Sequence, residues 1–239
     1  MSESSNLPRI LLFVNVLLLA CSHQGSSPFA AASGVTRADD GAKNRQHRII
    51  PLRPMQGDVE ILYGDPEKPG EPFVMRIREL PGTIVPPHSH PVDEHITVIS
   101  GTWYFALGDK FDRDALKEIR TGGYAFAPKG STMFGYSPDG AVVQVHGVGP
   151  FHIHWLHGVA TLDSPNAAAL FAFRKDERID SPRGKGTIRQ GYASGQIVQY
   201  EIAADDGMLF MVNQDEMRRV TAPPPPVSSA SPRRRAVRR

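Results

Sequence analysis

From residue 48 onward the chain consists of short apolar or alternating stretches, and a glycine, proline or aspartate separates each from the next. The 22 glycines and 21 prolines also favour turns over long helices. The expected strands are 59–63, 73–80, 94–100, 102–107, 123–127, 141–146 and 151–156. Many short strands at this spacing predict an all-β sandwich or barrel. The stretch 112–120 is the exception, and we expect it to form a helical turn between two groups of strands.

A second, smaller set of strand-like stretches occupies residues 168–221. Its apolar runs are 184–189, 196–202 and 208–212, and Asp205, Asp206 and Gly207 form a hairpin signal between the last two. The pattern resembles small SH3-like barrels of the KOW or Tudor type. The resemblance implies either a module that binds peptides or nucleic acid, or a structural addition to the first domain.

The first 21 residues resemble a bacterial lipoprotein signal. Arg9 precedes an apolar run, 10–20, which is too short to span a bilayer but fits the core of a signal peptide. Cys21 follows at once and is the only cysteine, so no internal disulfide can form. The resemblance implies a signal peptide over 1–20, export to the cell envelope or periplasm, and a lipid anchor at Cys21. The alternative is a plain secretory signal in which Cys21 is incidental.

The two ends of the mature chain are expected to be flexible. Residues 21–45 are rich in Ser, Ala, Gly and charge with no apolar period, which is typical of a tether. The net charge of +2 comes from five arginines in the last seven residues, and the rest of the chain has 22 basic and 25 acidic side chains. Residues 222–239 therefore read as a disordered Pro/Arg-rich tail, either solvated or attracted to anionic envelope phosphates. We expect no nucleic-acid partner for an exported chain.

His88, His90 and Glu94 form the most informative cluster of chemically active residues. His88 and His90 are two residues apart, so both imidazoles project from one face of an extended chain. Glu94 shares their parity and reaches the same point if the chain bends at Pro91, or if the two segments lie on adjoining strands. Two imidazoles and a carboxylate suit a divalent ion such as Zn, Fe, Mn or Ni, and three ligands leave positions open for water or substrate.

The spacing around these residues also matches the first sequence motif of the cupin superfamily. Gly82 lies six residues before His88, and Gly101 lies seven after Glu94, as that motif requires. The second motif is present in part, as Gly122, Pro128 and Gly130, but Met133 stands where its histidine is usual and Ser137 where its asparagine is usual. The resemblance implies a jelly-roll-type β-barrel over residues 46–163, similar to small single-barrel cupins of bacterial envelopes. It also implies a possible homodimer.

Three interpretations of Met133 remain open. It could ligate copper through its thioether, fill space beside a three-ligand site, or mark a relic pocket without a tightly held metal. His146 and His154 are weaker candidates for a replacement ligand, because His152 and His154 share parity and could face inward. His95 has the opposite parity to Glu94 and should point away from the metal.

The cupin resemblance implies metal-dependent chemistry on a small organic molecule, but it does not distinguish a dioxygenase from an isomerase or a hydrolase. The chain has no phosphate-binding glycine loop, no nucleophile elbow and no cysteine available as a nucleophile. One alternative is a non-enzymatic protein that binds or senses a metal or small ligand. A third is a structural envelope protein with a relic pocket.

Overall fold

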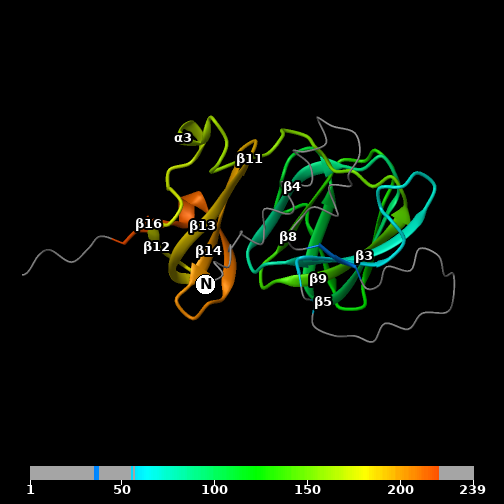
Figure 1. Cartoon of the computed structure of the whole chain (residues 1–239), viewed down its shortest axis with the longest axis horizontal. Helices are drawn as coiled ribbons and strands as arrows, with labels where there is room; N and C mark the ends of the chain where they lie inside the picture. The colour runs from blue at the N-terminus through cyan, green and yellow to red at the C-terminus, as the bar shows by residue number, and fades with distance from the viewer. Residues whose placement is uncertain (1–34, 38–54, 56, 221–239) are drawn as a thin grey trace, which may run out of the picture.

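The computed structural model describes residues 35–37, 55 and 57–220 (Figure 1). The predicted signal peptide, Cys21 and the arginine-rich tail lie outside the described residues. Within them the predicted all-β class is confirmed, since helical structure there is limited to helix α3 (Ala167–Leu170) and the 3₁₀ turn η2 (Gln214–Glu216). No helix in the described ranges is both long and apolar enough to cross a bilayer.

The first unit is a double-sheet β-barrel whose two sheets share the long strand β5 (Glu94–Leu107) (Figure 1). The first half of β5 joins a sheet with β2 (Val59–Tyr63), β3 (Pro72–Glu79), β7 (Tyr124–Ala127) and β9 (Ala141–Val148). Its second half joins β4 (Thr83–Ser89), β6 (Lys117–Arg120), β8 (Met133–Ser137) and β10 (His154–Trp155). This is the jelly-roll arrangement that the cupin resemblance implies.

The alternation of apolar residues positions the core of this barrel. In β5, Ile96 and Val98 face inward, and Val143 and Val145 of β9 lie opposite them in register. Gly101 marks the place where β5 passes from one sheet to the other. It has a positive φ of 76°, and a Cβ there would lie 2.2 Å from a backbone oxygen of the turn after β8, so only glycine fits.

Three local expectations are wrong. Residues 117–120 form strand β6 rather than part of a helical turn, because Ile119 packs against the core while its neighbours on either side face solvent. Of the expected strand 151–156, only His154–Trp155 pairs with β4. Within the predicted tether, Val35–Arg37 forms strand β1, which pairs in parallel with β2.

The second unit is a separate antiparallel sheet with its own core. Its strands are β11 (Ala160–Thr161), β12 (Arg178–Ser181), β13 (Gly184–Ser194), β14 (Ile197–Ala204), β15 (Leu209–Asn213) and β16 (Arg218–Arg219). Their order is β15-β14-β13-β12-β16, and β11 pairs with β13. The core centres on Ile188, Tyr200 and Ile202, which are fully buried. The hairpin expected at 205–207 is present. The SH3-like assignment stays a prediction.

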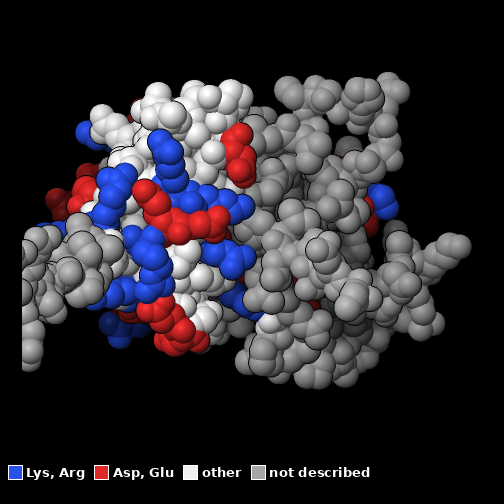
Figure 2. Space-filling model, turned by 60° about the vertical axis from the view of Figure 1, so that its left-hand side comes forward, with Lys and Arg blue, Asp and Glu red and all other residues white. Residues whose placement is uncertain are grey.

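Charges of both signs alternate on the face of the second unit that is turned forward in Figure 2. The second unit also has two exposed ion pairs, Arg178 with Asp205 and Arg219 with Glu177. Exposed pairs of this kind contribute little to stability, on the order of 0–1 kcal/mol.

The second unit docks on the barrel through a buried amide. The Gln199 side chain accepts a hydrogen bond from the Ile84 backbone N–H at 2.9 Å and donates one to the Gly82 carbonyl at 3.0 Å. The Met211 N–H adds a bond to the Pro81 carbonyl at 2.8 Å. A Cβ on Gly82 would lie 2.2 Å from the Met211 oxygen, so the first cupin-motif glycine also permits this contact.

Candidate metal centre

His88, His90 and Glu94 all line one small cavity of about 50 Å³ inside the barrel. His88 lies near the end of β4, and Glu94 is the first residue of β5. The chain bends at residues 91–92 between these strands, so the expected bend at Pro91 is present. Because β4 and the first half of β5 belong to different sheets, the bend carries the carboxylate across to the imidazoles.

The hydrogen bonds of His90 determine which of its nitrogens is free. Its Nδ1 lies 2.8 Å from the backbone carbonyl of His152. A carbonyl can only accept, so Nδ1 carries the proton and Nε2 presents a lone pair. That Nε2 is buried and has no hydrogen-bond partner, and the residue is only 2% exposed. A buried polar atom without a partner needs an explanation, and a bound metal would supply one.

His88 repeats the same arrangement. Its Nδ1 lies 2.8 Å from the Pro86 carbonyl, so its Nε2 is also the unprotonated nitrogen. The rings of His88 and His90 meet edge to face with centroids 5.0 Å apart. Histidines that ligate metals characteristically donate their other N–H to a backbone carbonyl or a carboxylate, which fixes the tautomer and the ring orientation.

The electrostatics of the cluster favour neutral imidazoles. Burial lowers the pKa of His88 to about 4 and, with the nearby His88, that of His90 to about 3. Burial also raises the pKa of Glu94 to about 8. The Glu94 Oε2 lies 3.6 Å from the His90 Nε2, and because His90 is neutral this contact is no ion pair. A divalent cation would offset the burial of the carboxylate charge.

The other predicted residues divide between the cavity and the surface. Met133 is 2% exposed, lines the cavity and lies directly opposite His88 in register. His146 lies on the outer face of the barrel, where it stacks on His95 with centroids 4.8 Å apart, and His154 is exposed. Neither His146 nor His154 lines the cavity, although His154 lies near enough to contribute to the lowered pKa of His90. His95 points away from the cavity, as expected, and its Nδ1 lies 2.7 Å from the Tyr124 hydroxyl.

Two polar residues of the cavity were missed by the sequence reasoning. Glu79 lines it and is 7% exposed, and burial together with Asp58 raises its pKa to about 8. The indole Nε1 of Trp103 is buried without a hydrogen-bond partner in the described part of the chain. Strand parity could have identified Glu79, because it is in phase with the buried Phe73 and Ile77.

The donors fit a divalent metal in kind, but they are not gathered at one point. Among residues 35–37, 55 and 57–220, no group of three His, Cys, Asp or Glu side chains is placed to hold an ion as it stands. The lone pair of His90 and the Glu94 carboxylate face each other across 3.6 Å, which is longer than a hydrogen bond. A metal would require the three side chains to close by small movements within the cavity.

Comparison with known proteins gives structural likenesses only. No family model and no curated protein matches the chain. A double-stranded β-helix protein from Klebsiella pneumoniae aligns at 19% identity over 46% of this chain and 98% of its own, with a TM-score of 0.35. An oxalate oxidase aligns at 22% identity over 35% of this chain and 45% of its own, with a TM-score of 0.30. A DMSP lyase from Ruegeria pomeroyi aligns at 19% identity over 33% of this chain and 38% of its own, with a TM-score of 0.29. Likenesses at this level assign no function to the chain.

Proposed function

We propose that the barrel is a cupin-type metal site that holds one divalent ion through His88, His90 and Glu94 and acts on a small organic molecule. The observation that carries the proposal is the buried lone pair of the His90 Nε2, which has no hydrogen-bond partner and lies beside a carboxylate. Three ligands would leave coordination positions open toward the cavity.

The chain's own residues would fix and enclose the reacting groups. The Pro86 and His152 carbonyls orient the two imidazoles through their Nδ1–H groups. The Trp103 N–H is available to donate to an oxygen of the bound molecule, and the apolar walls exclude water. A bound metal would supply Lewis acidity or lower the pKa of a bound water.

The alternative is a protein that binds a metal or small ligand without turnover. One observation favours it: the cavity of about 50 Å³ leaves little room for an organic substrate beside an ion. Met133 contributes to this, because it fills the wall opposite His88, where the family's second motif usually has a histidine.

Elemental analysis tests the proposal most directly. Residues 22–239, purified without an affinity tag and dialysed against metal-free buffer, are expected to retain close to one divalent metal per chain. The same protein unfolded with a chelator and refolded should take up the metal again. A folded, monodisperse protein that holds no metal after isolation and binds none on titration would contradict the proposal.

We also propose that the protein is exported and anchored at Cys21. The support is the apolar run 10–20 with the only cysteine at its end. A Cys21→Ser variant, expressed in a bacterial host, is expected to move from the membrane fraction to the soluble envelope fraction, because a lipid chain would be lost. Ser22→Ala serves as the control and should stay in the membrane fraction. Membrane partition that is unchanged in Cys21→Ser would contradict lipidation.

A further inference from the structure

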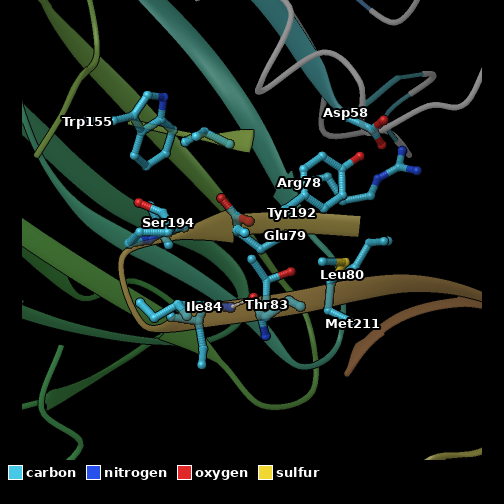
Figure 3. Close-up of a pocket in the computed structure, with 16 residues that line it drawn as sticks. Asp58, Arg78, Glu79, Leu80, Thr83, Ile84, Trp155, Tyr192, Ser194 and Met211 are labelled. Atoms are coloured by element: carbon cyan, nitrogen blue, oxygen red, sulfur yellow. Dashed lines mark hydrogen bonds between the residues drawn. The ribbon is translucent and has the colours of Figure 1, made fainter. Parts of the chain in front are cut away.

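Apolar surface of the barrel is covered at one place and exposed at another. At the contact between the two units, barrel residues such as Ile84 and second-unit residues such as Met211 line one small cavity, so each unit covers the other there (Figure 3). By contrast, several apolar residues on the outer face of the sheet formed by β2, β3, β9, β5 and β7 remain exposed. That outer face therefore offers apolar surface to another molecule.

Five residues lie in one row across the outer face of this sheet: Tyr63, Val74, His146, His95 and Phe126. The row follows the register of the paired strands. Tyr63 of β2 pairs with Val74 of β3, and Val74 pairs with His146 of β9. His146 pairs with His95 of β5, and His95 pairs with Phe126 of β7. Because directly paired residues point to the same face of a sheet, the five side chains form one continuous strip.

Two more apolar residues widen this strip. Tyr124 lies two residues before Phe126 on β7, and Val148 lies two residues after His146 on β9, so both share the outward parity. We call these seven residues the outer band. Tyr63, Tyr124, Phe126 and Val148 are between 42% and 55% exposed, and they make up half of the eight large apolar side chains that are exposed in the described residues.

The rings at the centre of the outer band already pack on one another. The His95 ring stacks on His146 with centroids 4.8 Å apart and lies 5.1 Å from the Phe126 ring. The His95 Nδ1 also lies 2.7 Å from the Tyr124 hydroxyl. Side chains that are held in place before association lose less conformational entropy when they are covered, so this surface is prepared for a contact.

The outer band is uncharged apart from any protonation of its two histidines, since it contains no Asp, Glu, Lys or Arg. The charged side chain next to it on the sheet is Arg76, which is 9% exposed and donates to the Gln144 side chain at 3.3 Å. A strongly acidic or basic partner would find no counter-charge here. A second copy of the same band meets no like-charge repulsion.

The area of the outer band sets the strength of such a contact. An aromatic side chain buries about 150–250 Å² when it is fully covered. Three aromatic residues of the band are about half exposed, and with the other members the band can bury roughly 500 Å² on each copy. Two copies would bury about 1,000 Å² in total, which is the lower limit for a specific interface. The area therefore fits a weak, concentration-dependent dimer.

We propose that the outer band is the contact surface of a homodimer in which two copies of this chain pack face to face. A two-fold contact uses the same patch on both copies, so the outer band alone is sufficient. Stacked sheets lie about 10 Å apart with their side chains interdigitated, which would cover the exposed rings of both copies. The proposal does not depend on the metal centre, because the band lies on the opposite face of the sheet from the cavity.

Sedimentation velocity of residues 22–239 between 1 and 300 μM tests the proposal. A monomer–dimer equilibrium with a Kd on the order of 10 μM is expected for an interface of this size. Phe126→Lys and Tyr63→Lys should each raise the Kd at least tenfold, because each dimer would bury the new charge twice without a partner.

Leu107→Lys and Met208→Lys are the matched controls. Both residues are exposed at least as much as Phe126 but lie elsewhere, at the end of β5 and on the second unit. Their Kd should equal that of the parent. All four positions are exposed, so circular dichroism should show unfolding temperatures near that of the parent, and a variant that is unfolded is replaced by Tyr124→Lys.

A parent protein that remains monomeric at 300 μM would overturn the proposal. Dimerisation that persists unchanged in Phe126→Lys and Tyr63→Lys, or that is weakened equally in the two controls, would place the contact elsewhere and overturn it too. Co-sedimentation of a monomeric parent with phosphatidylglycerol vesicles, lost in Phe126→Lys, would instead identify the outer band as a membrane contact.

Discussion

Replacement of His90 by phenylalanine is expected to weaken divalent-metal binding by at least about a hundredfold, because the variant loses one of the three side chains that hold the ion in the proposed site. Phenylalanine is the informative choice at this position. The His90 ring stacks on Phe151 with centroids 4.1 Å apart and an interplanar angle of 16°, and a phenyl ring preserves this contact. Alanine would instead leave a cavity and destabilise the core by roughly 2–4 kcal/mol, which would confuse loss of ligand with loss of fold.

The metal-free variant is expected to unfold at a temperature close to that of the metal-free parent. It loses the bond to the His152 carbonyl but no longer buries an unsatisfied nitrogen. Competition with a chromogenic chelator measures the affinity, and circular dichroism measures the unfolding. His146→Phe on the outer face is the matched control, and its metal affinity should equal that of the parent. If His90→Phe bound metal as tightly as the control, the ion would not be held by His90.

The local part of the candidate site could be predicted from the sequence because strand parity determines it. His88 and His90 share a face on any extended chain, and the bend at Pro91 returns Glu94 to the same cavity. The outward direction of the His95 side chain follows from the same rule, since adjacent residues of a strand point to opposite faces. The expectation that His154 could face inward rested on the same rule, but the rule holds only within a regular strand. Here strand pairing covers only His154–Trp155.

The non-local part could not be predicted in this way. The buried Gln199 amide binds Gly82 and Ile84, which are more than a hundred residues away in the chain, and a lone glutamine in a strand gives no sign of such a partner. The secondary structure of residues 117–120 was also ambiguous, because a short mixture of charged and apolar residues fits one helical turn as well as one short strand. Pairing with β5 decides between them, and that pairing is a tertiary contact.

Glu79 is expected to make the protein less stable as the pH rises, and Glu79→Gln should remove much of this dependence. The pKa of the folded protein's Glu79 is about 8, above the ordinary value of 4.5. The native state therefore binds this proton more strongly than the unfolded state does. The contribution of Glu79 to stability is complete below pH 4.5 and is lost as the pH rises toward 8. Between pH 4.5 and pH 8 the loss in the free energy of unfolding amounts to at most about 4 kcal/mol.

The measurement is urea unfolding of metal-free protein at pH 5, 7 and 9. A chelator is present throughout, so that release of a bound metal at low pH cannot change the measured stability. Glu79→Gln should match the parent at pH 5 and exceed its free energy of unfolding by a few kcal/mol at pH 9. Some slope should remain, because burial also raises the pKa of Glu94 to about 8 and that of Glu201 to about 7. Glu118→Gln should follow the parent throughout. Parallel curves for the parent and Glu79→Gln would show that Glu79 is already ionised, and so solvated or paired, in the folded protein at neutral pH.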